Sequence, residues 1–146
     1  MKKLTLCVIT LASVATISAC QQTAKNEDNN SQALSVKAIE VHDEIMPQIS
    51  TFDKHTVLID SLLGDLSAVK AAHPDLDTTN TRKDLTTLKD DLDAATDKMM
   101  VWMHEYTTDS TDIEYQKAEV NRISQLKTEF EKVTAEANRL LAPFNK

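Results

Sequence analysis

Glycine and proline are scarce in this chain of 146 residues, which contains one glycine and three prolines. Both residue types mark turns, so their scarcity leaves few places for loops. After residue 31 no stretch alternates Val, Ile, Thr and aromatic residues between turn residues, so strands are not expected. Because the chain has a single glycine, a glycine-rich phosphate loop is also excluded. The sequence therefore predicts long helices.

Cysteine is also scarce, and both cysteines, Cys7 and Cys20, lie near the N-terminus. Two lysines precede an apolar run of 14 residues, Leu4 to Ile17, which is shorter than the roughly 20 residues of a membrane-spanning helix. The run leads into Ile17-Ser18-Ala19-Cys20, where two small residues stand before the cysteine. This segment resembles the lipobox of bacterial lipoproteins, in which a peptidase cuts before the cysteine and the thiol carries a diacylglyceryl group.

The resemblance divides the chain into three parts. Residues 1–19 would be a cleaved signal peptide, residues 20–31 a lipidated Cys20 with a flexible polar tether, and residues 32–146 a helical domain. A lipoprotein cysteine carries at least two acyl chains, which suffice for stable attachment to a membrane. The residue after Cys20 is Gln21 rather than Asp, which by resemblance to lipoprotein sorting implies the outer membrane of a bacterial envelope, facing the periplasm.

Cleavage would leave a mature chain of 127 residues, a length that suits one domain with a modest core. A lipidated Cys20 would form no disulfide, so stability must come from packing. The mature chain would carry 14 Lys and Arg against 23 Asp and Glu, a net charge of −9. Nucleic acids and anionic lipid head groups are therefore not expected as partners.

Three segments carry apolar residues at alternating steps of three and four, which is typical of helices packed in a bundle. The first holds Ala38, His42, Ile45, Ile49, Phe52, Thr56, Ile59, Leu63 and Leu66. The second holds Leu85, Leu88, Leu92, Ala95, Met99, Trp102 and Tyr106. The third holds Ile113, Val120, Ile123, Leu126, Phe130, Val133, Ala137, Leu140 and Phe144.

Short polar links, residues 73–80 and 107–112, join the three segments, so that neighbouring helices should be antiparallel. The sequence therefore predicts an all-α protein, an antiparallel up-down-up bundle of three long helices. Pro47 lies inside the first stripe without shifting its phase, which favours a kink, and a true break would give four helices. Gly64 is a second weak point of that helix.

Methionine and histidine gather at two places on the predicted helices, with His42 and Met46 on the first and Met99 to His104 on the second. A first loop centred near residue 77 would put Ser50 level with His104, and a second centred near residue 109 would put Tyr115 level with His104. The bundle end nearest the tether would then collect six side chains within about two helical turns. These are His42, Met46, Met103, His104, Tyr115 and Glu119.

Two interpretations of this end remain open. Thioether and imidazole groups suit Cu(I), for which the candidate ligands are His42, Met46, Met100, Met103 and His104, or less readily an axial pair on haem. In the plainer interpretation the protein has no cofactor beyond the lipid, the methionines fill an irregular bundle end, and His42 pairs with Glu119 or caps a backbone carbonyl.

No catalytic set is recognisable in the sequence. His104-Glu105 begins a zinc-protease motif, but position 108 is Thr where a second histidine is needed. The segments 42–47 and 99–103 are similar to stretches of small helical lipoproteins of bacteria, a group without a settled activity. We therefore expect a non-enzymatic module that binds a protein partner in the envelope, through a surface containing His42, Trp102, Tyr115 and Glu119. A metal-binding lipoprotein and an inhibitor of an envelope or secreted enzyme are the alternatives.

Overall fold

The computed structural model describes residues 18–144, with side chains from residue 30 onward. Every regular element in this part of the chain is helical, which confirms the all-α prediction. The order is α1 (Ser18–Ile45), the short 3₁₀-helix η1 (Met46–Gln48), α2 (Ile49–Gly64), α3 (Leu66–Ala72), α4 (Thr78–Glu105), α5 (Ile113–Leu141) and the 3₁₀-helix η2 (Ala142–Phe144). The predicted signal residues up to 17, and the side chain of Cys20, lie outside the described residues.

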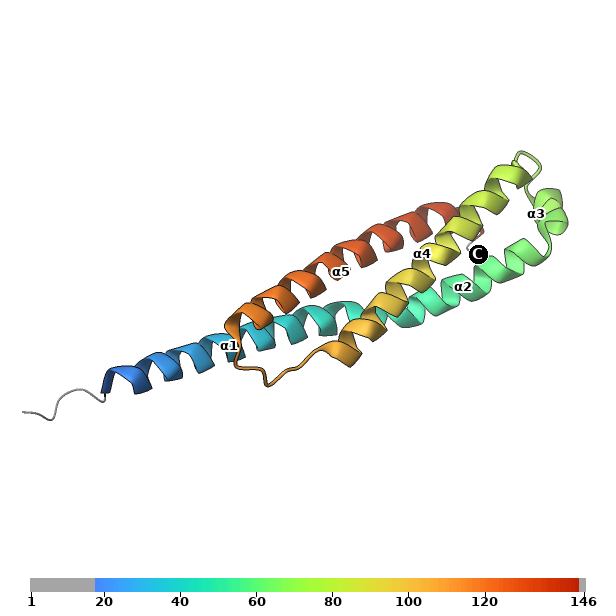
Figure 1. The fold of residues 1–146 in the computed structure, drawn as a ribbon. Helices are drawn as coiled ribbons and strands as arrows, with labels where there is room; N and C mark the ends of the chain where they lie inside the picture. Colours follow the sequence, from blue (N-terminus) through green and yellow to red (C-terminus); the bar gives the residue numbers. More distant parts are fainter. Residues whose placement is uncertain (1–17, 145–146) are drawn as a thin grey trace, which may run out of the picture.

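The helices form three antiparallel rows (Figure 1). In the first row α1 and α2 follow one another along the bundle; α4 runs back beside them, and α5 returns beside α4 and α1. Ion pairs tie the rows together at their surfaces. Lys89 of α4 meets Asp60 of α2, and Lys127 of α5 meets Glu44 of α1, each with a nitrogen–oxygen distance of 2.5 Å. The predicted up-down-up arrangement is therefore confirmed.

The first row is interrupted twice. At Pro47 the α-helix gives way to η1, because proline has no N–H to continue the ladder, and α2 then resumes along the same row. The sharper interruption follows Gly64, where Asp65 leaves helical geometry with φ −139° and ψ 64°. There α3 turns across the end of the bundle (Figure 1). The break at Pro47 that the sequence leaves open is therefore present, and a second, sharper bend at Asp65 divides the first row into three helices.

An aspartate stands directly before each of the helices α3, α4 and α5 and accepts hydrogen bonds from their first N–H groups. Asp77 accepts from the backbone N–H of Thr79 and Asn80, and Asp112 accepts from Glu114 and Tyr115. These N–H groups have no partner inside the helix, so a side-chain carboxylate there fixes where the helix begins. Each of the two predicted loops thus ends at an aspartate that caps the next helix, Asp77 for α4 and Asp112 for α5.

The turn at Asp65 shifts the register of the first hairpin. His42 lies against Trp102, with ring centroids 5.7 Å apart, whereas a loop centred at residue 77 would put it level with residue 112. The prediction was wrong by about ten residues, or roughly 15 Å of helix. Residues 65–77 turn across the end of the bundle and do not extend the first row, so the hairpin is centred nearer residue 72.

The core consists largely of the residues that the three stripes predict. All of the predicted α4 positions from Leu85 to Trp102 are buried, and Phe52 of α2 stacks on Phe130 of α5 with ring centroids 4.9 Å apart. One prediction is corrected at the end of α5, where Leu141 is fully buried and Leu140 only partly. Leu141 takes the inner position because it continues the steps of four from Val133 and Ala137 within α5.

Residues 20–31, which the sequence analysis assigns to a tether, lie within α1. Ser31 is buried, so contact with the bundle begins at about the predicted domain boundary. None of the helices in the described part of the chain is both long enough and apolar enough to cross a membrane.

Candidate functional site

Four rings from three helices stack in series at the bundle end where α4 meets α5. His42 lies on Trp102, Trp102 lies on Tyr106 at 4.6 Å between centroids, and Tyr106 lies on Tyr115 at 6.4 Å. We call these four residues the ring stack. Because α1, α4 and α5 each contribute to it, the ring stack joins all three rows of the bundle.

A polar network surrounds the phenol of Tyr106. The Tyr106 hydroxyl lies 3.0 Å from Ser35 Oγ and 2.9 Å from Gln116 Oε1. The amide of Gln116, which is fully buried, donates to the carbonyl oxygens of Thr107 and Ser110, while Ser35 Oγ donates to the carbonyl of Thr108. Burial raises the pKa of the Tyr106 phenol, because the charged form would lose its hydration. The network holds the α4–α5 loop against α1.

Three polar atoms at this end make no hydrogen bond within the described structure: His42 Nε2, Trp102 Nε1 and Glu119 Oε2. Glu119 is nevertheless partnered through its other oxygen, 3.7 Å from Arg122. A hydrogen bond from Arg122 to Glu105 raises the pKa of the Arg122 guanidinium. His42 pairs through Nδ1 with its neighbour Asp43 at 2.9 Å, and not with Glu119 as the plainer interpretation expects.

The predicted interaction residues are thus brought together, but two of them face inward. His42, Trp102 and Tyr115 belong to the ring stack. Glu119 lies close enough for its negative charge to help raise the pKa of the Tyr106 phenol. Trp102 is 2 % exposed and Glu119 8 % exposed. The exposed apolar side chains next to them are Met100, Val101 and Met103, which are 41 to 50 % exposed.

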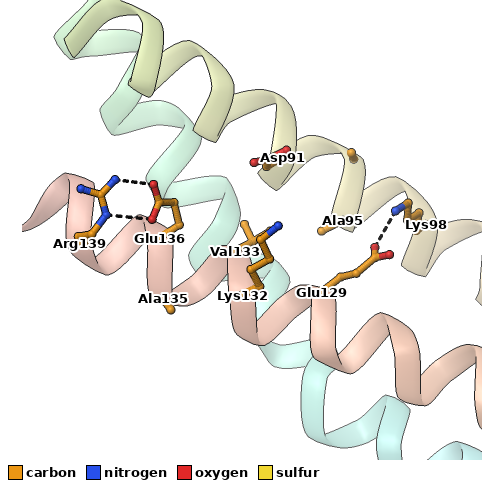
Figure 2. A pocket seen from close by; sticks show the side chains of 10 residues that line it. Asp91, Ala95, Lys98, Glu129, Lys132, Val133, Ala135, Glu136 and Arg139 are labelled. Carbon is orange, nitrogen blue, oxygen red and sulfur yellow. Dashed lines mark hydrogen bonds and ion pairs between the residues drawn. The ribbon is translucent and has the colours of Figure 1, made fainter. Parts of the chain in front are cut away.

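A groove between α4 and α5 begins at this end. Its first part, about 300 Å³, is lined by Val101, Trp102, Arg122 and Leu126 among others. A wider part of about 550 Å³ continues from Lys98 and Glu129 to Arg139 (Figure 2). Both parts border on Lys98 and Glu129, whose ion pair crosses between them, and we call the two parts together the α4/α5 groove. Its lining includes four small side chains, of which Ala95 and Val133 are buried at the floor and Ala94 and Ala135 are exposed.

Charges line both walls of the α4/α5 groove. Lys98 and Glu129 form an ion pair across it at 2.7 Å, and Glu136 pairs with Arg139 along α5 (Figure 2). The Arg139 guanidinium lowers the pKa of the Glu136 carboxyl. Between these two pairs lie Asp91 on α4 and Lys132 on α5, and neither forms a hydrogen bond or ion pair with any described residue.

The candidate copper ligands fall into two groups. Met100, Met103 and His104 lie on the exposed side of the last turns of α4. Met46 packs against the core and His42 lies on Trp102. In the described part of the chain no three His, Cys, Asp or Glu side chains are grouped as metal ligands would be, a finding that leaves methionine sulfur aside.

Ser35, Tyr106 and Gln116 are the site residues that the sequence analysis did not assign to the site. Gln116 could have been found, because it stands between Ile113 and Val120 at a position where the α5 stripe requires a buried residue. A polar residue at a core position indicates a buried hydrogen-bond network. Ser35 lies three residues before Ala38, on the upstream continuation of the first stripe, so the same argument could have found it.

No family model, no curated protein and no solved structure matches this chain. Its function must therefore be argued from its own residues.

Proposed function

We propose that this protein is a lipid-anchored envelope lipoprotein whose helical bundle is a non-enzymatic binding module for a protein partner. The observation that carries the proposal is the α4/α5 groove, which is lined by small apolar side chains, has charged walls and has the exposed Val101 at one end. Grooves of this kind receive amphipathic helices, whose apolar side enters the groove while the charged walls fix its register.

The dimensions support a helical partner. On α5 the groove extends from Arg122 to Arg139, which corresponds to roughly 25 Å, or about five helical turns. The exposed Val101 lines its start, and Leu126 adds a second apolar side chain there. The ring stack and its polar network would keep this surface rigid, because the side chains behind it are fixed by stacking and hydrogen bonds.

The lipobox supports anchoring through Cys20 in the envelope, with the outer membrane, facing the periplasm, as the proposed location. In α1, Cys20 and Ser35 are 15 residues apart, which in a helix corresponds to roughly 22 Å. The end that carries the ring stack would then be the end nearer the membrane, and the partner would approach the groove from the envelope space.

The groove is tested by site-specific photo-crosslinking of the full chain in cells. A photoreactive phenylalanine replaces Val101 beside the groove, and as a matched control it replaces Val57, which is 70 % exposed on α2. We expect a discrete adduct from position 101 and none from position 57. Equal labelling at both positions, or none at either, would contradict a binding role for the groove. The mass of the adduct separates a second copy from another envelope protein or an inhibited enzyme.

The anchor is tested separately by mass spectrometry of membrane fractions. Cys20 should carry the lipid, and a Cys20→Ser chain should lose membrane attachment. An unmodified N-terminus in the wild-type protein would overturn the anchoring proposal while leaving the groove untouched.

A copper-binding role is the second candidate, because Met100, Met103 and His104 share one exposed side of α4. Spacings of three and four residues put these soft and borderline ligands together on a helix. The test is a Cu(I) titration of the lipidated protein against a competing chelator. Met100→Leu with Met103→Leu should abolish the binding, whereas Met99→Leu, at a fully buried position, should not. An unchanged affinity of the double variant for Cu(I) would rule out copper binding at these residues.

A further inference from the structure

We propose that a second groove, between α2 with the adjoining η1 on one side and α5 on the other, binds a neutral saccharide. We call it the α2/α5 groove, and its polar lining consists of Gln48, Thr51, Glu131, Thr134 and Asn138. It shares only Ala135 with the α4/α5 groove, so the inference does not depend on the binding role proposed for that groove.

The α2/α5 groove opens because α2 and α5 are not close neighbours. Along the bundle α5 packs mainly against α1 and α4, whereas α2 packs mainly against α4. Phe52 of α2 and Phe130 of α5 stack across the space between the two helices, and Phe52 lies at the floor of the groove. The groove has a volume of about 470 Å³, which lies within the range of small-molecule sites.

The lining of the α2/α5 groove is polar but almost uncharged. Amide and hydroxyl groups supply most of its polar atoms, and Glu131 is the one charged residue among the described residues that line it. The α4/α5 groove is lined instead by several acids and bases. Charged walls select charged partners, whereas amides and hydroxyls, which both donate and accept, suit a ligand that carries hydroxyl groups of its own.

A hydrogen bond across the α2/α5 groove fixes the orientation of one amide. The Thr134 hydroxyl donates to Gln48 Oε1 at 3.0 Å, and the Gln48 amide nitrogen donates to no described residue. The exposed side chains of Thr51 and Asn138 also make no hydrogen bond within the described structure. Donors and acceptors are therefore available on both walls, and they are held by helices, which lowers the cost of ordering them when a ligand binds.

The chemistry of the lining favours a saccharide over a peptide. The backbone groups of α2 and α5 are hydrogen-bonded within their helices, so an extended peptide finds no strand edge to pair with. A charged helix finds no opposite charge there apart from Glu131. The ring of a sugar has hydroxyl groups at its rim and apolar C–H groups on its faces. Ala135 and the methyl groups of the two threonines can contact those faces while the free amides bind the hydroxyls.

The experiment is a titration of the isotopically labelled full chain, followed by nuclear magnetic resonance in a detergent without a sugar head group. The probes are tetrasaccharides of glucose and of N-acetylglucosamine, added up to about 10 mM so that weak binding is detected. We expect at least one probe to shift the backbone amide signals of Thr51, Ala135 and Asn138. Added salt should leave the affinity unchanged, because the ligand carries no charge to be screened.

Two substitutions locate the site. Asn138→Ala removes a free amide from the α5 wall and should weaken saccharide binding by about three- to tenfold, which corresponds to one hydrogen bond. Adding Thr51→Ala on the α2 wall should weaken the binding further. Asn121→Ala is the matched control, because Asn121 is an exposed asparagine of the same helix outside the groove, and it should bind like the wild type. The dispersion of the amide signals verifies that each variant is folded.

The possible outcomes decide the inference without touching the proposed function. No shift with either tetrasaccharide, or shifts confined to residues outside the α2/α5 groove, would overturn saccharide binding. An Asn121→Ala chain that binds as weakly as Asn138→Ala, or an affinity that falls steeply with added salt, would overturn it as well. The Val101 photo-adduct reports on the other groove, so the two proposals can fail separately.

Discussion

The two parts of the α4–α5 interface use their polar groups differently. Near the loop, Tyr106 and Gln116 make hydrogen bonds within the chain, and Arg122 pairs with Glu105. Farther along, around Ala95 and Val133, the walls diverge into a groove where Asp91 and Lys132 form no hydrogen bond or ion pair with the described residues. The same two helices therefore have one closed part and one open part.

The closed part of the interface contributes to the stability of the fold, and the open part contributes to the recognition of a partner. Buried rings and satisfied hydrogen bonds contribute to folding, because their loss leaves cavities or unpaired groups inside the protein. Exposed charges contribute little to folding and much to the choice of partner. Substitutions in the closed part should therefore change the free energy of unfolding, and substitutions in the open part should change association.

The largest effect is expected for Trp102→Ala. Trp102 is buried between His42 and Tyr106, so its truncation should lower the free energy of unfolding by about 3–5 kcal/mol through lost packing and a cavity. Urea unfolding followed by circular dichroism measures this loss. The exposed neighbour substitution Val101→Ala is the control and should stay within about 0.5 kcal/mol of the wild type.

Trp102→Phe sharpens this prediction, because it keeps an aromatic ring and removes the Nε1–H group that has no acceptor among the described residues. Its loss of stability should be clearly smaller than that of Trp102→Ala. If both substitutions cost less than about 1 kcal/mol, the ring stack would not hold the bundle end together.

A middle-sized effect is expected for Tyr106→Phe. The substitution removes the hydroxyl that bonds within the network and leaves the buried Gln116 Oε1 without its partner, at a cost of about 1–3 kcal/mol. The matched control is Tyr115→Phe. The Tyr115 hydroxyl accepts from the exposed backbone N–H of Thr107, where water can replace it, so a smaller loss is expected.

The same tyrosine gives a pH test. Burial raises the pKa of Tyr106 above its ordinary value of 10.0, so the unfolded chain loses this proton at lower pH than the folded one. The stability contributed by the neutral phenol is present below pH 10 and is lost as the pH rises through the folded pKa. Tyr106→Phe should lack this alkaline loss. An identical alkaline decline in both proteins would show that Tyr106 is not its source.

Apolar periodicity predicts most of the fold. Positions such as Leu88, Met99 and Phe130 are core residues because a helix must bury one stripe, and this follows from the sequence alone. Periodicity does not reveal where a stripe turns: Asp65 continues no apolar pattern, and its geometry depends on capping α3. The hairpin register, and with it the neighbour of His42, could therefore not be predicted.

The candidate site was only partly predictable, because periodicity does not fix the orientation of side chains at the border of an apolar stripe. The sequence indicates that His42, Trp102 and Tyr115 lie near one another, and they do share the ring stack. It does not show whether a side chain faces inward or outward at the border of a stripe, where a small rotation of the helix decides. Glu119 is buried for this reason, whereas Met100 lies off the apolar stripe of its helix and is exposed, as periodicity predicts.

The smallest effect on stability is expected in the open part of the interface. Asp91→Asn and Lys132→Ala should each change the free energy of unfolding by no more than about 0.5 kcal/mol, because neither side chain forms a hydrogen bond or ion pair with the described residues. The same substitutions should weaken binding of the partner in the α4/α5 groove, and added salt should weaken it in the wild type, since exposed charges are screened. Urea unfolding of the purified chain and the yield of the Val101 photo-adduct give the two quantities. Lost stability with unchanged association would reverse the assignment of the two parts, because Asp91 and Lys132 would then support the fold.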